Sequence, residues 1–141
     1  MWISFVEPAL TVSKHDDIFI PHINSEVTFE RALLTQRNNF TGKVKIIEED
    51  GKTIIRLEDI NQKLSIPACR NTQVKLTLDY AKENSLVLGP LKASTGNMNY
   101  LLPPGEDIKN YNGVQIWCKT FSFDYAHVEI IAPDKKPLFL K

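Results

Sequence analysis

The chain has 141 residues, of which 43% are hydrophobic and 24% are charged, which is typical of one globular domain and unlike a disordered segment. Its 17 basic and 17 acidic residues give a formal net charge of zero, which argues against a general nucleic-acid or anionic-membrane binder. No apolar stretch approaches the roughly 20 residues that span a bilayer, and Glu7 and Pro8 interrupt the apolar start, so we expect neither a membrane span nor a signal peptide.

Residues 1–36 lack the regular alternation of the later sequence. We therefore expect an N-terminal extension that packs along a β domain formed by residues 37–141. The one helix candidate lies here, at residues 25–36, where Ser25 could cap a helix and Glu26 and Glu30 would favour its first turns. The same stretch would also fit a sheet, so both structures stay open.

Residues 42–59 predict a β-hairpin. Aliphatic residues such as Val44 and Ile46 alternate with charged residues on both sides of the turn, which is the period of a half-buried strand. Asp50 and Gly51 at the centre tolerate the positive φ that a tight hairpin turn requires.

The rest of the chain contains further strand patterns separated by residues typical of turns. In residues 72–80, apolar and polar side chains alternate strictly. Similar patterns follow at residues 85–89, 97–102, 113–121 and 125–132. Strands at this density, without a βαβ rhythm, predict an all-β fold: an antiparallel sandwich or barrel-like domain of about eight strands.

The sequence contains no recognisable motif for a metal site or a nucleotide site. The histidines His15, His22 and His127 lack the close spacing with another His or Cys that marks a metal site. The loop around Gly96 resembles a phosphate-binding loop, but Asn97 follows where that motif needs Lys and then Ser or Thr. We expect no metal, and a turn with structural glycines in place of a nucleotide site.

The strand pattern at residues 113–121 raises a question about Cys118. Val114, Ile116 and Cys118 share one face, while Trp117 and Lys119 share the other. The aliphatic face is the natural core face, which favours a buried cysteine. The aromatic residues that follow shift to the parity of Trp117. This indicates either a sheet buried on both faces or a bulge near residues 119–120.

Cys118 could also be functional. A reactive thiolate needs a neighbouring cation or a metal, and His127 would lie close if residues 113–121 and 125–132 formed a tight hairpin. A bridge to Cys69, the second cysteine of the chain, stays open because spacing alone cannot establish it.

Three blocks of sequence suggest a family. They are Leu88-Gly89-Pro90-Leu91-Lys92, then Gly96-Asn97-Met98-Asn99-Tyr100, and then residues 114–121, VQIWCKTF. In order and spacing they resemble the DM-thirteen domain, also called the electron-transfer DM-thirteen domain, over about residues 37–131. The chain departs from the family pattern at residues 66–79, where Cys69 stands in place of a Gly-Pro-Asp-Leu-like turn.

The resemblance implies a β-sandwich-like domain of exported or cell-surface proteins, whose cysteine has been proposed to act as a redox thiol or as a ligand to a group such as haem. It thus suggests that Cys118 is the redox group of an electron-transfer module. His127, Met98 and Met1 are the candidates for a second haem ligand, and the cofactor is otherwise undefined. We expect a redox or other protein partner.

The alternative is a β-sandwich binding or adaptor domain without catalysis, in which Cys118 is structural. Its recognition surface would be formed by the motif residues Leu91, Lys92, Asn97, Asn99, Tyr100 and Trp117. If Cys118 is functional, the two upstream blocks should converge on it in space. Whether the chain is an enzyme is left open, because the sequence shows no recognisable set of catalytic residues.

Overall fold

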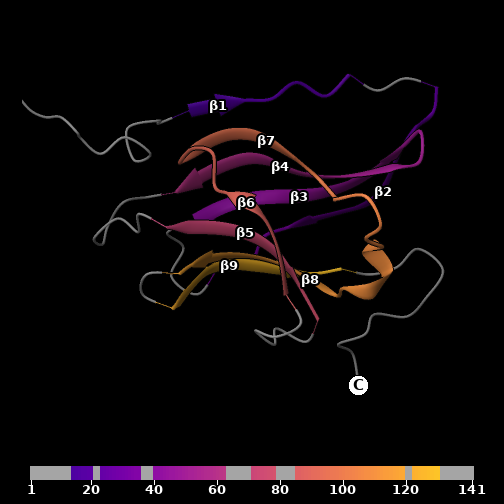
Figure 1. Cartoon of the computed structure of the whole chain (residues 1–141). Coiled ribbons are helices and arrows are strands. Elements are labelled where there is room, and N and C mark those ends of the chain that lie inside the picture. The colour runs from indigo at the N-terminus through magenta and orange to yellow at the C-terminus, as the bar shows by residue number, and fades with distance from the viewer. Residues whose placement is uncertain are drawn as a thin grey trace, which may run out of the picture.

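The computed structural model describes residues 14–20, 23–35, 40–62, 71–78, 85–119 and 122–130. Two antiparallel sheets, one with a short parallel strand at its edge, lie face to face (Figure 1). The strands are β1 (Lys14–Asp16), β2 (Ser25–Ala32), β3 (Phe40–Glu49), β4 (Lys52–Gln62), β5 (Thr72–Thr77), β6 (Ser85–Pro90), β7 (Thr95–Leu101), β8 (Gly113–Cys118) and β9 (Phe123–Glu129).

The five-stranded sheet has the order β1-β7-β4-β3-β2, and the four-stranded sheet has the order β6-β5-β8-β9. The all-β prediction is confirmed, as a sandwich and not as a closed barrel. In the described part of the chain, the one helical element is the short 3-10 helix η3 (Ile108–Asn110), whose first turn Asp107 caps.

Of the two structures left open for residues 25–36, the strand is the one observed: Ser25–Ala32 form strand β2 and not a helix. This strand pairs with β3 from Ser25 opposite Glu49 to Ala32 opposite Lys43. Sheet pairing along eight residues, together with burial of Phe29 in the core, outweighs the modest local preference for a helix.

The predicted hairpin is confirmed as β3 and β4. Asp50 and Gly51 form its turn with φ values of 51° and 78°, so both residues adopt the left-handed conformation that such turns require. The hairpin places β3 and β4, the longest strands among the described residues, next to each other in the five-stranded sheet.

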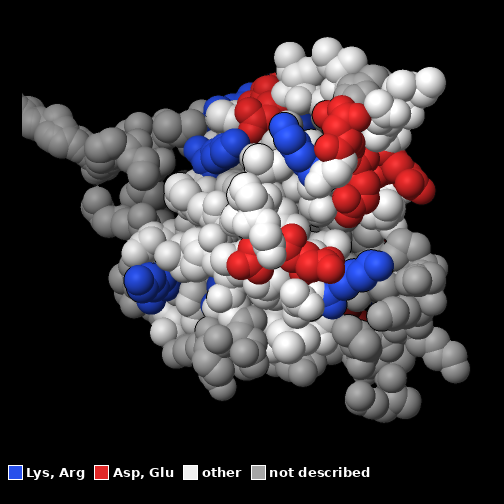
Figure 2. Space-filling view, turned by 45° about the vertical axis from the view of Figure 1, so that its right-hand side comes forward, with Lys and Arg blue, Asp and Glu red and all other residues white. Residues whose placement is uncertain are grey.

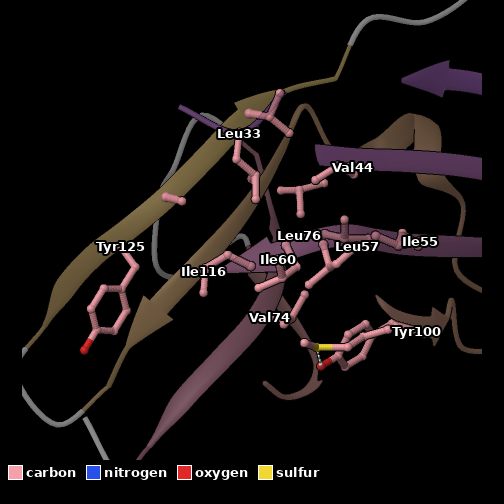
Figure 3. Close-up of a cluster of buried hydrophobic side chains, with 14 of the residues drawn as sticks. Leu33, Val44, Ile55, Leu57, Ile60, Val74, Leu76, Tyr100, Ile116 and Tyr125 are labelled. Atoms are coloured by element: carbon pink, nitrogen blue, oxygen red, sulfur yellow. Dashed lines mark hydrogen bonds between the residues drawn. The ribbon is translucent and has the colours of Figure 1, made fainter. Parts of the chain in front are cut away.

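The core is one apolar layer between the two sheets (Figure 3). Alternate residues of each strand point into it, because the side chains of a strand alternate between its two faces. The fully buried aliphatic side chains of this layer include Val44 and Ile46 of β3, Ile55 and Leu57 of β4, Val74 and Leu76 of β5, and Val114 and Ile116 of β8. Burial of each such side chain stabilises the fold by about 1.5–3 kcal/mol.

A bulge separates the two ends of the β8–β9 hairpin. Ile116 pairs with Ala126, whereas Trp117 pairs with Asp124, so Tyr125 is the extra residue in the register of β9. The phase shift expected near residues 119–120 therefore occurs earlier in the hairpin, and the extra residue is on β9. The bulge allows both Tyr125 and Ala126 to be buried.

Candidate functional site

Cys118 is the last residue of β8 and lies on its inner face. It is 1% exposed and pairs with Thr72 of β5 on one side and Phe123 of β9 on the other. The sequence prediction that Cys118 shares the core face with Val114 and Ile116 is confirmed.

The sulfur of Cys118 is disulfide-bonded, and no described cysteine is free. The accessible, ionised thiol that the redox hypothesis anticipated is therefore not present in this state. The sequence has one other cysteine, Cys69, which lies outside the described residues.

His127 does not face Cys118. It pairs with Gln115 across the β8–β9 hairpin, and Gln115 lies on the opposite face of β8 from Cys118 because the two are three residues apart. Its Nδ1 atom lies 2.8 Å from a carboxylate oxygen of Asp124. The proposed pairing of a cysteine with this histidine is thus absent.

The first motif block approaches Cys118 through Leu91. The Leu91 backbone N–H donates a hydrogen bond of 2.9 Å to the carbonyl of Thr72, the residue opposite Cys118. Leu91 therefore lies about two strand spacings, roughly 10 Å, from the cysteine. Its half-buried side chain packs against the same apolar cluster.

The second motif block divides between the two faces of β7. Met98 and Tyr100 point into the core, where both are buried, so Asn97 and Asn99 point outward. The Tyr100 hydroxyl donates to the Pro90 carbonyl at 2.7 Å and accepts from the Lys92 N–H at 3.1 Å, which joins the two blocks. Burial raises the pKa of the Tyr100 hydroxyl far above its ordinary value.

On the outer side of the five-stranded sheet, Lys92 and Asn99 hold a carboxylate. The Lys92 ammonium donates to Asp17 Oδ2 at 2.8 Å and to the Asn99 carbonyl at 2.9 Å. The Asn99 N–H donates to the same Asp17 oxygen at 2.9 Å. His15 Nε2 lies 2.7 Å from the other oxygen of Asp17.

These contacts determine the charge state of Asp17. Burial by itself would raise the pKa of Asp17, but the hydrogen bonds from Asn99, Lys92 and His15 favour the carboxylate and lower the pKa to about 2. Asp17 is therefore ionised throughout the neutral and mildly acidic range.

Arg56 connects the backbone of Asp17 to a second charged group. Its Nη1 atom donates to the Asp17 carbonyl at 2.9 Å and to Asn99 Oδ1 at 2.8 Å, and its Nε atom donates to Glu58 at 2.7 Å. Glu58 also pairs with Lys45 at 3.1 Å. Burial opposes ionisation of Glu58, but these two cations outweigh it and lower its pKa.

Charges of both signs are mixed over the face shown in Figure 2, where several acidic side chains lie together at the upper right and basic side chains are scattered around them. This agrees with the balanced composition, and it suits recognition of a specific arrangement of charges better than attraction of a polyanion.

Trp117 lies apart from the other motif residues, on the outer face of the four-stranded sheet. The Lys75 ammonium lies 4.6 Å from the centroid of its ring, and Gln115 beside it donates to Asp124 at 3.2 Å. The residues expected to form one recognition surface therefore occupy three places. Leu91 and Tyr100 are in or against the core, Lys92, Asn97 and Asn99 are on one outer face, and Trp117 is on the other.

The candidate ligands for haem do not converge. The Cys118 sulfur is already bonded, Met98 is fully buried on the inner face of β7, and His127 contacts Asp124 on an outer face. Met1 lies outside the described residues. The described residues therefore do not fit a haem ligand set, and they contain no group of three His, Cys, Asp or Glu residues that could hold a metal ion.

Sequence reasoning missed Asp17, Arg56 and Glu58. Arg56 and Glu58 are two residues apart, the spacing that places two side chains on one face of a strand. The alternation of polar and apolar residues in Asn97-Met98-Asn99-Tyr100 is a further signal that the polar members face outward. The involvement of Asp17 carries no local signal, because its partner Lys92 is 75 residues away.

Comparison with known proteins identifies the domain. The family model described as "Electron transfer DM13" matches residues 32–130, as the three motif blocks predicted. No curated protein and no solved structure gives a significant match. Among the described residues, no helix is long and apolar enough to cross a membrane.

Proposed function

Because the chain belongs to the electron transfer DM13 family, we propose that it is an electron-transfer domain whose redox group is the disulfide of Cys118. The family name indicates the general role. The observation that carries the finer proposal is that the motif cysteine is oxidised and held at the end of β8. We take Cys69, the other cysteine of the sequence, as its partner.

The proposed chemistry is a two-electron exchange. Reduction adds two electrons and two protons, breaks the sulfur–sulfur bond and leaves two thiols. A dithiol donor would supply both through a mixed disulfide and become a disulfide itself. The reverse reaction passes the electrons to a partner disulfide.

The position of Cys118 sets a condition on this reaction. A thiolate must reach one of the two sulfurs, and the Cys118 residue is only 1% exposed. Attack at the Cys69 sulfur, or local opening of the hairpin end beyond Cys118, would meet this condition. Strand ends open at a lower free energy than the centre of a sheet.

The same burial favours a second candidate function. A disulfide in the apolar layer could simply stabilise the sandwich, typically by about 2–4 kcal/mol, in a domain that only binds a partner. The two candidates differ in whether Cys118 can be reduced while the domain stays folded. In both cases the disulfide supports an oxidising compartment, such as that of exported proteins.

Native-state cycling of Cys118 separates the candidates. The oxidised chain is incubated with a stoichiometric small dithiol, thiols are alkylated, and peptides containing Cys118 are quantified by mass spectrometry. The redox role predicts alkylation of Cys118 in folded protein and its protection again after a small disulfide is added. Cys118→Ser serves as the blank. Alkylation that occurs only in urea would contradict the redox role and leave the structural one.

A further inference from the structure

The first described segment of the chain, residues 14–20, is bound by the domain as an additional strand. It precedes the residues that match the family, 32–130, and runs along the edge of the five-stranded sheet (Figure 1). Strand β1 pairs in parallel with β7, with His15 opposite Gly96 and Asp16 opposite Asn97. One residue further, the Asp17 N–H donates to the Asn97 carbonyl at 2.9 Å.

Gly96 makes this close approach feasible. A Cβ atom at position 96 would collide with the backbone of His15. Its φ of +114° is also one that residues with side chains rarely adopt. The domain therefore has an edge strand, β7, with room for a second backbone at one defined register.

Side chains of the domain recognise the inward face of the segment. The carboxylate of Asp17 is held by Lys92 and the N–H of Asn99, as described above, and Arg56 holds the Asp17 carbonyl. The Arg56 guanidinium carbon also lies 6.0 Å from the centroid of the Phe19 ring, which is a cation–π distance. Asp17 and Phe19 thus present an acid and an aromatic ring two residues apart.

The outward face of the segment contributes little to its attachment. Ile18 and Ile20 are 76% and 74% exposed, so the segment buries few aliphatic side chains. Hydrogen bonds and charge attach it, and such polar contacts are exchangeable because each contributes only about 0.5–3 kcal/mol net. Arg56, Lys92, Gly96, Asn97 and Asn99, which bind it, all belong to the region that matches the family.

We propose that the β7 edge, with the cluster of Lys92, Arg56 and Asn99, is a recognition site for an extended acidic peptide. Residues 14–20 are its tethered ligand, which an extended segment of a partner protein replaces. The preferred ligand runs parallel to β7 and carries an Asp with an aromatic residue two positions later. This is recognition by strand addition, in which the backbone provides affinity and side-chain contacts provide specificity. The site does not depend on the redox role of Cys118.

The tether predicts how such a ligand behaves. A segment joined to its site by a short linker has an effective concentration of order millimolar, so a free peptide competes poorly with it. Weakening the tethered copy without altering the site should therefore expose the site to a peptide in solution.

The test uses the full chain carrying Asp17→Lys, which places a third positive charge beside Lys92 and Arg56. A fluorescent synthetic peptide with the sequence of residues 12–22 is titrated with this variant and with the original chain, and its anisotropy is measured. We expect binding to the variant at least tenfold tighter than to the original chain. Peptide in which Lys replaces Asp17 should bind at least tenfold more weakly to the variant than the unaltered peptide.

Two controls separate the site from a general charge effect. Glu26→Lys makes the same change in charge at an exposed position of β2, and it should leave peptide binding as weak as in the original chain. Adding Lys92→Glu to Asp17→Lys restores the pairing within the chain with reversed charges. This double variant should again exclude the unaltered peptide.

Folding of each variant is checked by the dispersion of its amide NMR spectrum. If Asp17→Lys does not fold, Asp17→Asn replaces it, with an expected gain in peptide binding of about threefold or more. Equal binding of the peptide to the original chain and to the folded variant would overturn the proposal. So would binding that is insensitive to the Asp of the peptide.

Discussion

The apolar layer between the sheets and the charged outer face of the five-stranded sheet share strands but differ in what stabilises them. In β4, Leu57 belongs to the layer and Arg56 to the outer face. In β7, Tyr100 and Asn99 divide in the same way. The layer is stabilised by burial of apolar side chains, and this contribution does not depend on pH. The outer face depends on charges and hydrogen bonds that join residues far apart in sequence.

The motif residues of this chain are of two kinds. Those that face inward close the sandwich around Cys118. Of those that face outward, Lys92, Asn97 and Asn99 contact residues 14–20, whereas Trp117 lies on the other sheet. Substitutions in the two regions should therefore change the free energy of unfolding by different amounts and with a different dependence on pH.

The largest effect is expected in the apolar layer. Leu57→Ala removes a fully buried side chain and should lower the free energy of unfolding by about 2–5 kcal/mol, through lost burial and the cavity left behind. Urea denaturation measures it. Val87→Ala, at a position 46% exposed, is the control and should cost about 0.5 kcal/mol or less. Similar losses for the two variants would show that the layer is not the main source of stability.

The next largest effect on stability is expected at Gly96, where the backbones of β1 and β7 approach closely. Gly96→Ala should cost about 2 kcal/mol or more, because it combines an unfavourable φ with a collision against His15. Gly51→Ala is a matched control, since its φ is +78° but no atom lies near the added Cβ. The difference between the two unfolding free energies isolates the close approach. Equal costs would mean that β1 does not pack against β7 in solution.

A smaller, pH-dependent effect is expected at Asp17. Its pKa is about 2 in the folded chain against 3.8 ordinarily, so ionised Asp17 stabilises the fold above about pH 4, and this contribution is lost as the pH falls towards 2. With its side chain 26% exposed, screening limits the contribution to about 1 kcal/mol.

Asp17→Asn should therefore lower the unfolding free energy at pH 6 and have a much smaller effect near pH 2. Urea denaturation at several pH values measures the difference between the two chains. A difference that stays constant from pH 6 to pH 2 would show that the carboxylate is not paired as described.

The smallest effect is expected at the hydroxyl of Tyr111, which lies outside both regions although the residue packs against the core. Its hydroxyl donates to Glu106 at 2.8 Å on the exposed side of the loop before β8. Tyr111→Phe should change the unfolding free energy by about 0.5 kcal/mol or less, because solvent replaces exposed hydrogen bonds readily. Thermal denaturation checks it, and a loss above about 1 kcal/mol would extend the buried region to this loop.

The fold could be predicted wherever the sequence carries a local signal. Asp50 and Gly51 identify the hairpin turn, and alternation identifies β5 and β8. Residues 25–32 were ambiguous because their structure is decided by pairing with β3, and no property of the segment alone encodes that partner.

The candidate site was predictable only in part. Parity placed Cys118 in the core, but neither its disulfide nor the separation of Trp117 from Asn97 and Asn99 follows from spacing. The binding of Asp17 by Lys92 was not foreseen, because it depends on a register between β1 and β7 that sequence patterns do not define.

The measurement that tests the proposed redox role most directly is the reduction potential of the Cys118 disulfide. The folded chain is equilibrated in a series of dithiol and disulfide buffers, and the fraction of alkylated Cys118 is fitted to a two-electron transition. The proposal predicts a reversible midpoint between roughly −270 and −120 mV, the range of disulfides that exchange electrons. A midpoint below about −300 mV, the range of structural disulfides, would contradict it.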